Sequence, residues 1–282
     1  MKKSEGSKAF EEFYSIFPWP DDPKTEEGKE YFERAVSFME KLLTHPWIEV
    51  LTKKKKIKIL DVCSGVGFGS IALAKVLSEK NIKSEIVMAD LREDALKKAK
   101  SWGKELGIDK IKTLAMNAED VYKLKDTFDI ALMYGLSTPH FNPWQLERLF
   151  SSVASVVAHD GVFVLDESDR RYRIFLFNNY QWVLGEGLSN DKFCVSFQSG
   201  YSIKKGTFKR TYINFSKTPV KPIEMETFMW GLAEVGAFMW PFFNDVDLVP
   251  LEGNHFFLLG AAPRKSITPD MLKEPTILKE NS

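Results

Sequence analysis

The fold of this chain is decided by the segment Ile59-Leu60-Asp61-Val62-Cys63-Ser64-Gly65-Val66-Gly67-Phe68-Gly69. Its first residues form an apolar run that contains one acid, which predicts a buried strand with a carboxylate near its end. Gly65 and Gly67 then allow the backbone to approach a ligand closely, and the N-terminus of the following helix would face that ligand. In α/β sheets such ligands bind outside the carboxyl ends of the strands.

The same alternation of strand and helix continues on the C-terminal side of this segment. Five apolar runs are predicted strands: Ile57–Val62, Ser84–Ala89, Ile111–Met116, Phe128–Met133 and Gly161–Leu165. Helical patterns separate them at Gly69–Glu79, Glu93–Leu106, a short stretch near Asp120, and Pro143–His159. Apolar strands that alternate with helices predict a Rossmann-like α/β fold, a parallel sheet with helices on both faces.

Both ends of the chain depart from this rhythm. On the N-terminal side, the spacing of apolar residues predicts a helix over Thr25–Thr44. On the C-terminal side, a β-hairpin is predicted from Phe193–Ile203 and Thr207–Phe215, followed by a helix from about Glu224 to Val235. Two last apolar runs, Phe238–Val249 and His255–Ala262, predict a closing antiparallel strand pair.

These patterns predict three regions. Residues 1–52 would form an N-terminal helical cap, and residues 53–265 a catalytic domain. An insertion at about 170–222, containing the β-hairpin, would act as a lid over the strand tips. Residues 266–282 are polar and contain prolines, so we expect a loosely attached tail.

Composition excludes several classes of protein. The 282 residues include 39 basic and 39 acidic side chains, which is not the charge balance of a general nucleic-acid binder. The two cysteines, Cys63 and Cys194, have neither disulfide-framework nor zinc-site spacing, and no metal site is expected. No signal peptide and no run of about 18 apolar residues is present, so we expect a cytoplasmic protein without a membrane partner.

The glycine-rich turn must be tested against dinucleotide binding, because Gly65-Val66-Gly67 begins a GxGxxG pattern. The third glycine would fall at position 70, which is Ser70. Asp61 would also place a negative charge near a pyrophosphate, whereas it suits a ligand that carries ammonium and sulfonium cations. A nicotinamide oxidoreductase is therefore the least favoured interpretation.

The segment resembles the first motif of class I S-adenosylmethionine-dependent methyltransferases, acid-x-Gly-x-Gly-x-Gly. Asp61 matches the acid, and Gly65 and Gly67 match the second and third glycines, while Cys63 stands at the first glycine position. The resemblance implies that Asp61 orients the methionine part of the cofactor and that the backbone of residues 65–67 lines it.

Later segments resemble the same family at the following strand tips. Asp90 would bind the ribose hydroxyls, as expected for an acid about 20 residues beyond the glycines, and Leu91 would pack on the adenine. Asn117 holds the place of an acid that contacts the adenine amino group, with the Ala118 amide near the ring. Tyr134, at the tip of the fourth strand, would border the cofactor. The segment Leu232–Ala237 is similar to the family's last helix.

His140 follows the fourth strand, where this family binds its substrates, and is the candidate general base; a structural role is the alternative. Tyr134, Glu167 and Tyr172 are weaker candidates for the same role. The arginines of segment 170–173 could hold an anionic group of a substrate or form surface ion pairs.

The sequence thus predicts an S-adenosylmethionine-dependent methyltransferase, with S-adenosyl-L-methionine as cofactor. The expected acceptor is an O, N or C atom of a small molecule. RNA or protein substrates, and a non-catalytic protein that binds the cofactor for regulation, stay open as alternatives. The sequence does not specify the substrate or the oligomeric state.

Overall fold

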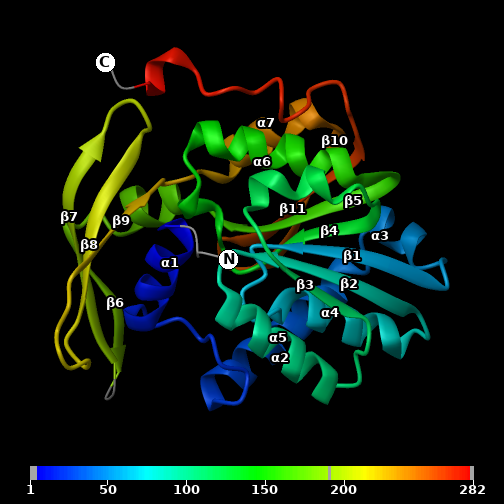
Figure 1. The fold of residues 1–282 in the computed structure, drawn as a ribbon, viewed down its shortest axis with the longest axis horizontal. Helices are drawn as coiled ribbons and strands as arrows, with labels where there is room; N and C mark the ends of the chain where they lie inside the picture. The colour runs from blue at the N-terminus through cyan, green and yellow to red at the C-terminus, as the bar shows by residue number, and fades with distance from the viewer. Residues whose placement is uncertain (1–4, 190–191, 280–282) are drawn as a thin grey trace.

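The computed structural model describes residues 5–189 and 192–279. Its centre is a seven-stranded sheet in the order β3-β2-β1-β4-β5-β11-β10 (Figure 1). The parallel strands are β1 (Lys56–Val62), β2 (Lys83–Asp90), β3 (Ile111–Ala115), β4 (Phe128–Met133) and β5 (Val157–Ser168). The sheet closes with β10 (Phe243–Glu252) and β11 (His255–Pro263), in which β11 runs antiparallel to both β5 and β10. The predicted Rossmann-like sheet and its antiparallel strand pair are confirmed.

Helices cover both faces of this sheet, because successive strand side chains point to opposite sides. Ile59 and Ile130 contribute to a core under α2 (Glu26–Leu42), α3 (Pro46–Leu51), α4 (Phe68–Glu79) and α5 (Glu93–Glu105). Their chain neighbours Leu60 and Ala131 face the opposite core, under α6 (Pro143–Val156), α7 (Leu232–Met239) and the 3-10 turn η1 (Ala118–Leu124). Three short turns, η2 (Thr138–His140), η4 (Trp240–Phe242) and η5 (Thr276–Leu278), complete these connections.

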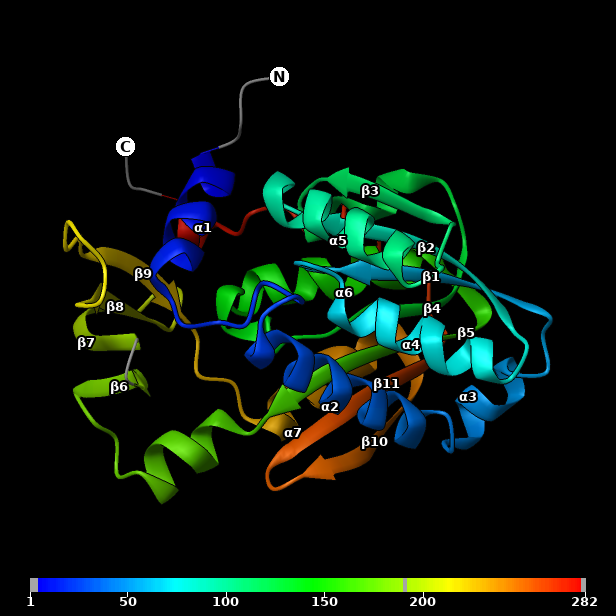
Figure 2. The same ribbon diagram turned by 90° about the horizontal axis from the view of Figure 1, so that it is seen from below.

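The predicted insertion contains a separate four-stranded antiparallel sheet in the order β6-β7-β8-β9, here named the lid after that prediction (Figure 2). Its strands are β6 (Val183–Ser189), β7 (Lys192–Ser202), β8 (Thr207–Asn214) and β9 (Ile223–Thr227), preceded by one helical segment, η3 (Arg171–Phe177). The pairing of β7 with β8 confirms the predicted hairpin.

The predicted helix from Glu224 to Val235 is wrong. Residues 223–227 form β9, and α7 begins only at Leu232, after Gly231. The sequence Ile-Glu-Met-Glu-Thr alternates between apolar and charged residues, and in β9 Ile223 and Thr227 are buried while Glu224 is exposed. This period of two is typical of a strand with one covered face.

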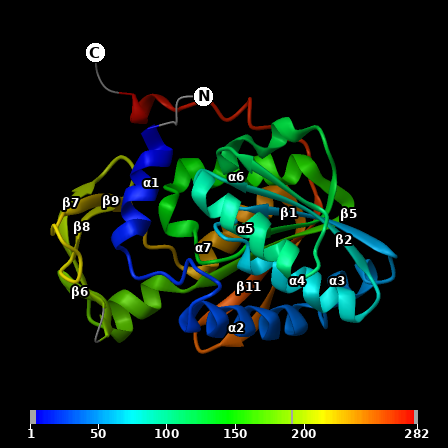
Figure 3. The same cartoon turned by 60° about the horizontal axis from the view of Figure 1, so that its bottom comes forward.

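An N-terminal helix that we did not expect, α1 (Glu5–Ile16), lies between the lid sheet and the central domain (Figure 3). Phe13 and Ile16 are buried against Tyr212 and Ile223 of the lid. The side-chain amide of Asn214 donates to the carbonyl oxygen of Ile16 at 2.7 Å. The lid sheet therefore uses α1 as the second layer of its core.

The segment after Arg264 contacts α6 where the structure describes it. Ser151 donates to the carbonyl of Ile267 at 2.7 Å, and Arg148 donates to the carbonyls of Pro269 and Leu272. None of the helices in residues 5–189 and 192–279 combines the length and the apolar character needed to cross a membrane.

The N-terminal cap of α2 gives a test of the fold. Thr25 accepts the N–H of Gly28 at 3.1 Å, and its hydroxyl donates to the carbonyl of Asp22 at 2.9 Å. Thr25→Ala should lower the free energy of unfolding by about 1 kcal/mol, because helix N–H groups lose their acceptor. Urea unfolding measures the change. Thr25→Ser keeps the hydroxyl and should stay near wild type; equal losses in both variants would contradict the cap.

Candidate functional site

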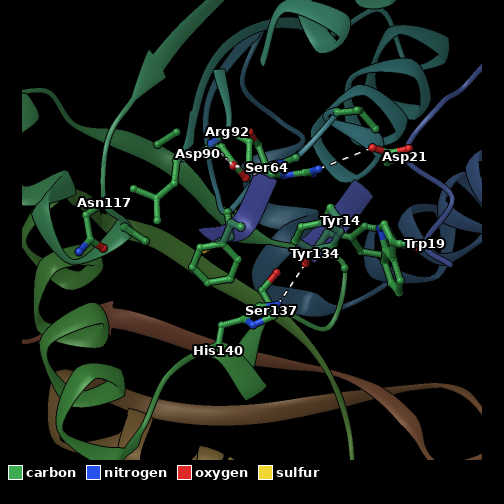
Figure 4. Close-up of a pocket in the computed structure, with 18 of the residues that line it drawn as sticks. Tyr14, Trp19, Asp21, Ser64, Asp90, Arg92, Asn117, Tyr134, Ser137 and His140 are labelled. Atoms are coloured by element: carbon green, nitrogen blue, oxygen red, sulfur yellow. Dashed lines mark hydrogen bonds and ion pairs between the residues drawn. The ribbon is translucent and has the colours of Figure 1, made fainter. Parts of the chain in front are cut away.

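A pocket opens at the carboxyl ends of β1, β2 and β4 and holds about 1000 Å³ of empty space, part of it open to solvent (Figure 4). Eight of the ten predicted site residues line it: Cys63, Gly65, Asp90, Leu91, Asn117, Ala118, Tyr134 and His140. The remaining two, Asp61 and Gly67, do not line it.

The glycine-rich turn has the backbone that its sequence requires. Gly65 and Gly67 have φ values of +53° and +81°, in the left-handed region that favours glycine. A Cβ at Gly67 would lie 2.8 Å from the Cε atom of Met88. Cys63 also has a positive φ, +55°, at the position where the family has its first glycine. The turn keeps its shape with a small non-glycine residue there.

Asp90 joins the tip of β2 to this turn. Its carboxylate accepts the N–H of Gly65 at 2.7 Å and the N–H of Arg92 at 2.8 Å. Burial raises the pKa of Asp90, although the Arg92 charge and these hydrogen bonds act in the opposite direction. The carboxylate is thus fixed at the pocket wall and can accept further hydrogen bonds from hydroxyl groups of a ligand.

Asp61 lies beneath the turn. One of its carboxylate oxygens, Oδ2, accepts the hydroxyl of Ser70 in α4 at 2.5 Å, and the other has no hydrogen-bond partner in the described part of the chain. Burial raises the pKa of Asp61 to about 7. The observed bond connects the end of β1 to the first turn of α4, and a role toward the methionine part of a cofactor stays a prediction.

Asn117 and Ala118 lie at the opposite end of the pocket from Tyr134 along the strand tips. Asn117 is exposed, and its side-chain oxygen accepts the N–H of Glu119 at 3.1 Å, which caps η1. A carbonyl oxygen has two lone pairs, so the same atom can accept one more donor. The geometry is compatible with the predicted contact to an adenine amino group.

The loop after β4 is held by Asp166 at the tip of β5. The carboxylate of Asp166 accepts the N–H groups of Gly135 and Leu136, both at 2.9 Å, and lies 3.2 Å from the Nε2 atom of His255. Its neighbour Glu167 is fully buried and bonds to Thr138 and Arg170. Glu167 therefore braces the loop and does not line the pocket. Tyr172 is half exposed on η3 and is also outside the pocket.

His140 is paired with Tyr14 of α1. The Tyr14 hydroxyl lies 3.1 Å from the Nε2 atom of His140, and the ring of Phe10 packs edge-on against the imidazole. Burial lowers the pKa of His140 to about 4, and the charges of Arg170 and Arg92 act in the same direction. Burial raises the pKa of Tyr14. At neutral pH the phenol is therefore protonated and the imidazole neutral, and the Nδ1 atom of His140 has no partner among the described residues.

The N-terminal segment contributes pocket residues that the sequence analysis missed: Phe10, Tyr14, Trp19, Asp21 and Tyr31. Arg92 was also missed; its guanidinium carbon lies 4.1 Å from the centre of the Tyr14 ring, and it forms an ion pair with Asp21 at 3.6 Å (Figure 4). The available signal was the spacing of Phe10, Phe13 and Phe17, which is typical of a helix with one apolar face.

No group of three or more His, Cys, Asp or Glu side chains in the described chain is arranged to hold a metal ion.

A family model described as a methyltransferase domain matches residues 59–161, the part of the chain that contains the glycine-rich turn and the tips of β1 to β4. Residues 59–161 of this chain therefore carry a methyltransferase domain. The family predicted from the glycine-rich turn is thereby confirmed. A search of curated proteins by sequence gave no match.

Solved structures share the methyltransferase fold over nearly the whole chain. The PH0226 protein from Pyrococcus horikoshii OT3 is 20% identical, with a TM-score of 0.62 over 90% of this chain and 99% of its own. The CcbJ methyltransferase from Streptomyces caelestis is 10% identical, with a TM-score of 0.62 over 93% and 99%. SAM-bound CalS10 from Micromonospora echinaspora, an amino pentose methyltransferase, is 14% identical, with a TM-score of 0.53 over 83% and 92%. At these identities the likeness establishes the fold alone.

The methyltransferase assignment makes Asp90 the first residue to test. Asp90→Ala should weaken S-adenosylmethionine binding at least about tenfold, because charge-assisted hydrogen bonds contribute roughly 1.5–3 kcal/mol each. Isothermal titration calorimetry measures the dissociation constant. Asp109→Ala removes an exposed acid outside the pocket and serves as the control. Unchanged affinity in Asp90→Ala would refute the ribose assignment.

The pKa of Asp61 predicts a pH-dependent stability. Its pKa is raised in the folded state, so its contribution to stability is present below about pH 4 and is lost as the pH rises to about 7. Asp61→Asn, which can still accept the Ser70 hydroxyl, should gain stability relative to wild type over this range, by on the order of a few kcal/mol. Urea unfolding of the ligand-free protein at pH 4.5 and 7 measures the difference.

His140 titrates in the same range with the opposite sign. Its lowered pKa means that stability rises as the pH increases from about 4 to 6.5. The free energy of unfolding should therefore change less with pH in the wild type than in either Asp61→Asn or His140→Gln. If the free energies of unfolding of Asp61→Asn and wild type differ by the same amount at pH 4.5 and at pH 7, the raised pKa of Asp61 is contradicted.

Proposed function

We propose that this chain transfers a methyl group from S-adenosylmethionine to an O, N or C atom of a small molecule. The observation that carries this proposal is the pocket next to His140, to which the N-terminal helix contributes side chains. Phe10 and Tyr14 of α1 line it together with Phe141 and Gln145. An acceptor there would contact side chains from α1 as well as from the loop after β4, which suits a compact molecule better than an RNA strand or a protein segment.

The pocket residues fit the proposed cofactor. A Cβ at Gly65 would lie 3.2 Å from Arg92, so the glycine keeps the turn open toward the pocket. In our proposal Asp90 holds the ribose, Leu91, Asn117 and Ala118 surround the adenine, and Tyr134 borders the methionine portion. When bound, the cofactor supplies an activated methyl group on a sulfonium leaving group.

The protein's own task is then to position the acceptor, exclude water and manage one proton. When an oxygen or nitrogen atom of the acceptor bonds to the methyl carbon, the hydrogen on that atom becomes acidic. Tyr14 can take that proton on its hydroxyl oxygen while it passes its own proton to Nε2 of His140, 3.1 Å away. The low pKa of His140 keeps its imidazole neutral and ready to accept at pH 7.

A small-molecule acceptor is also supported by analogy of fold, because CalS10 is an amino pentose methyltransferase. A cytoplasmic location stays a prediction from the sequence.

The test of the acceptor class is transfer of labelled methyl from S-adenosylmethionine into cell extract separated into small-molecule, RNA and protein fractions. Label in the small-molecule fraction supports the proposal. Label in RNA or protein overturns it in favour of a macromolecular acceptor. Cofactor binding without any labelled fraction points to the non-catalytic alternative.

With the acceptor in hand, His140→Ala should lower kcat by roughly 10²–10⁴-fold, because general base catalysis contributes factors of this size. The dissociation constant of S-adenosylmethionine should stay within about threefold of wild type. Tyr14→Phe removes only the hydroxyl and keeps the ring on Arg92, so it should lower kcat as well. If both variants retain wild-type kcat, the acceptor needs no deprotonation by this pair.

A further inference from the structure

An exposed apolar surface lies at one end of the lid, where η3 meets the turn between β7 and β8. Ile203, Phe177 and Leu176 are 88%, 73% and 72% exposed. Tyr172, Trp182 and Tyr201 are each more than half exposed. We call these six residues the apolar tip. Apolar side chains gathered in this way on a soluble domain mark a surface that binds a partner.

The two parts of the apolar tip are connected by packed rings beneath it. The ring of Phe208 lies 5.1 Å from that of Tyr201 and 6.3 Å from that of Phe175, between ring centres. Phe175 stacks on Tyr180 at 5.2 Å, and Tyr180 contacts Trp182 at 6.3 Å. These rings therefore connect η3 to strands β7 and β8 beneath the tip, and none of the six residues of the tip lines the methyltransferase pocket.

The segment that contains the tip carries an excess of positive charge, although the chain as a whole is neutral. Residues 170–227 contain ten basic and four acidic side chains, an excess of six positive charges that the rest of the chain balances. Two of the acids, Glu224 and Glu226, form ion pairs with Lys209 and Lys205. At the tip itself, Arg173 and Lys204 are exposed and have no ion pair within the described residues.

We propose that the apolar tip docks this enzyme on an anionic lipid surface. Ile203 and Leu176 would enter the boundary between headgroups and acyl chains, and Trp182 and Tyr201 would lie at the headgroup level. Arg173 and Lys204 would contact the anionic headgroups. The sequence analysis expected no membrane partner because no segment spans a bilayer, and surface docking needs no such segment.

The charge argues against a second copy of the chain as the occupant. A two-fold dimer through this surface would place the same positively charged tip against itself. Single-stranded RNA fits less well, because bases stack on aromatic faces whereas the most exposed side chain of the tip is the aliphatic Ile203.

The experiment is co-sedimentation of the full chain with vesicles of phosphatidylcholine, with and without phosphatidylglycerol. We expect binding only to the anionic vesicles, weakened by salt. Ile203→Asp should reduce the partition coefficient at least about tenfold, because it removes the inserting side chain and adds a repelled charge. The matched control is Val50→Asp, the same kind of change at a 58% exposed site on α3, which should bind as wild type.

Cofactor binding by Ile203→Asp, measured separately, shows that the variant is folded and that the pocket is intact. The proposal is overturned if the wild-type protein does not co-sediment with anionic vesicles, or if Ile203→Asp and Val50→Asp bind these vesicles equally. Binding of single-stranded RNA without vesicle binding would overturn it in favour of a nucleic acid. A dimer lost in Ile203→Asp, without vesicle binding, would overturn it in favour of self-association. Failure of the methyl-transfer assay leaves this measurement unaffected.

Discussion

The carboxylate of Asp90 accepts the N–H of Gly65 across the gap between two neighbouring strand tips, at 2.7 Å. Asp166, at the tip of β5, likewise accepts the N–H groups of Gly135 and Leu136 in the loop after the neighbouring strand β4. Parallel strands bring their loops together at one edge, where backbone donors have no strand partner. A carboxylate at the tip of one strand satisfies the loop of the next, so the same bonds that complete the backbone also fix the walls of the pocket.

The central sheet could be predicted because its signals are local. Ile59 and Leu60 sit in an unbroken apolar run that suits a strand covered on both faces, and each following helix begins and ends with recognisable residues. The capping box of α6, formed by Asn142 and Gln145, is visible in the sequence and is present in the structure. The error at β9 has the opposite cause. The conformation of β9 depends on its pairing with β8. Within the sequence, only the alternation of residues 223–227 indicated a strand.

The pocket residues at the strand tips could be predicted to the same extent, since Cys63, Gly65, Asp90 and Asn117 follow their strands directly. The part of the pocket around His140 depends on tertiary packing. Tyr14 reaches His140 because α1 packs against Tyr212 of the lid, more than 190 residues away in sequence. No local pattern could indicate that contact. Asp61 shows another limit: it lies near the end of β1, as the sequence predicted, but its carboxylate bonds to Ser70 and does not line the pocket.

The position of α1 also links the proposed methyl transfer physically to the proposed docking surface. One face of α1 carries Tyr14 and Phe10 into the pocket, and the other carries Phe13 and Ile16 into the lid core. The hydroxyl of Ser7 also donates to the carbonyl of Leu91, a residue that lines the pocket, at 2.8 Å. The packing of α1 therefore joins the lid sheet to the pocket. A partner bound at the proposed docking surface would contact the same four-stranded sheet against which α1 packs.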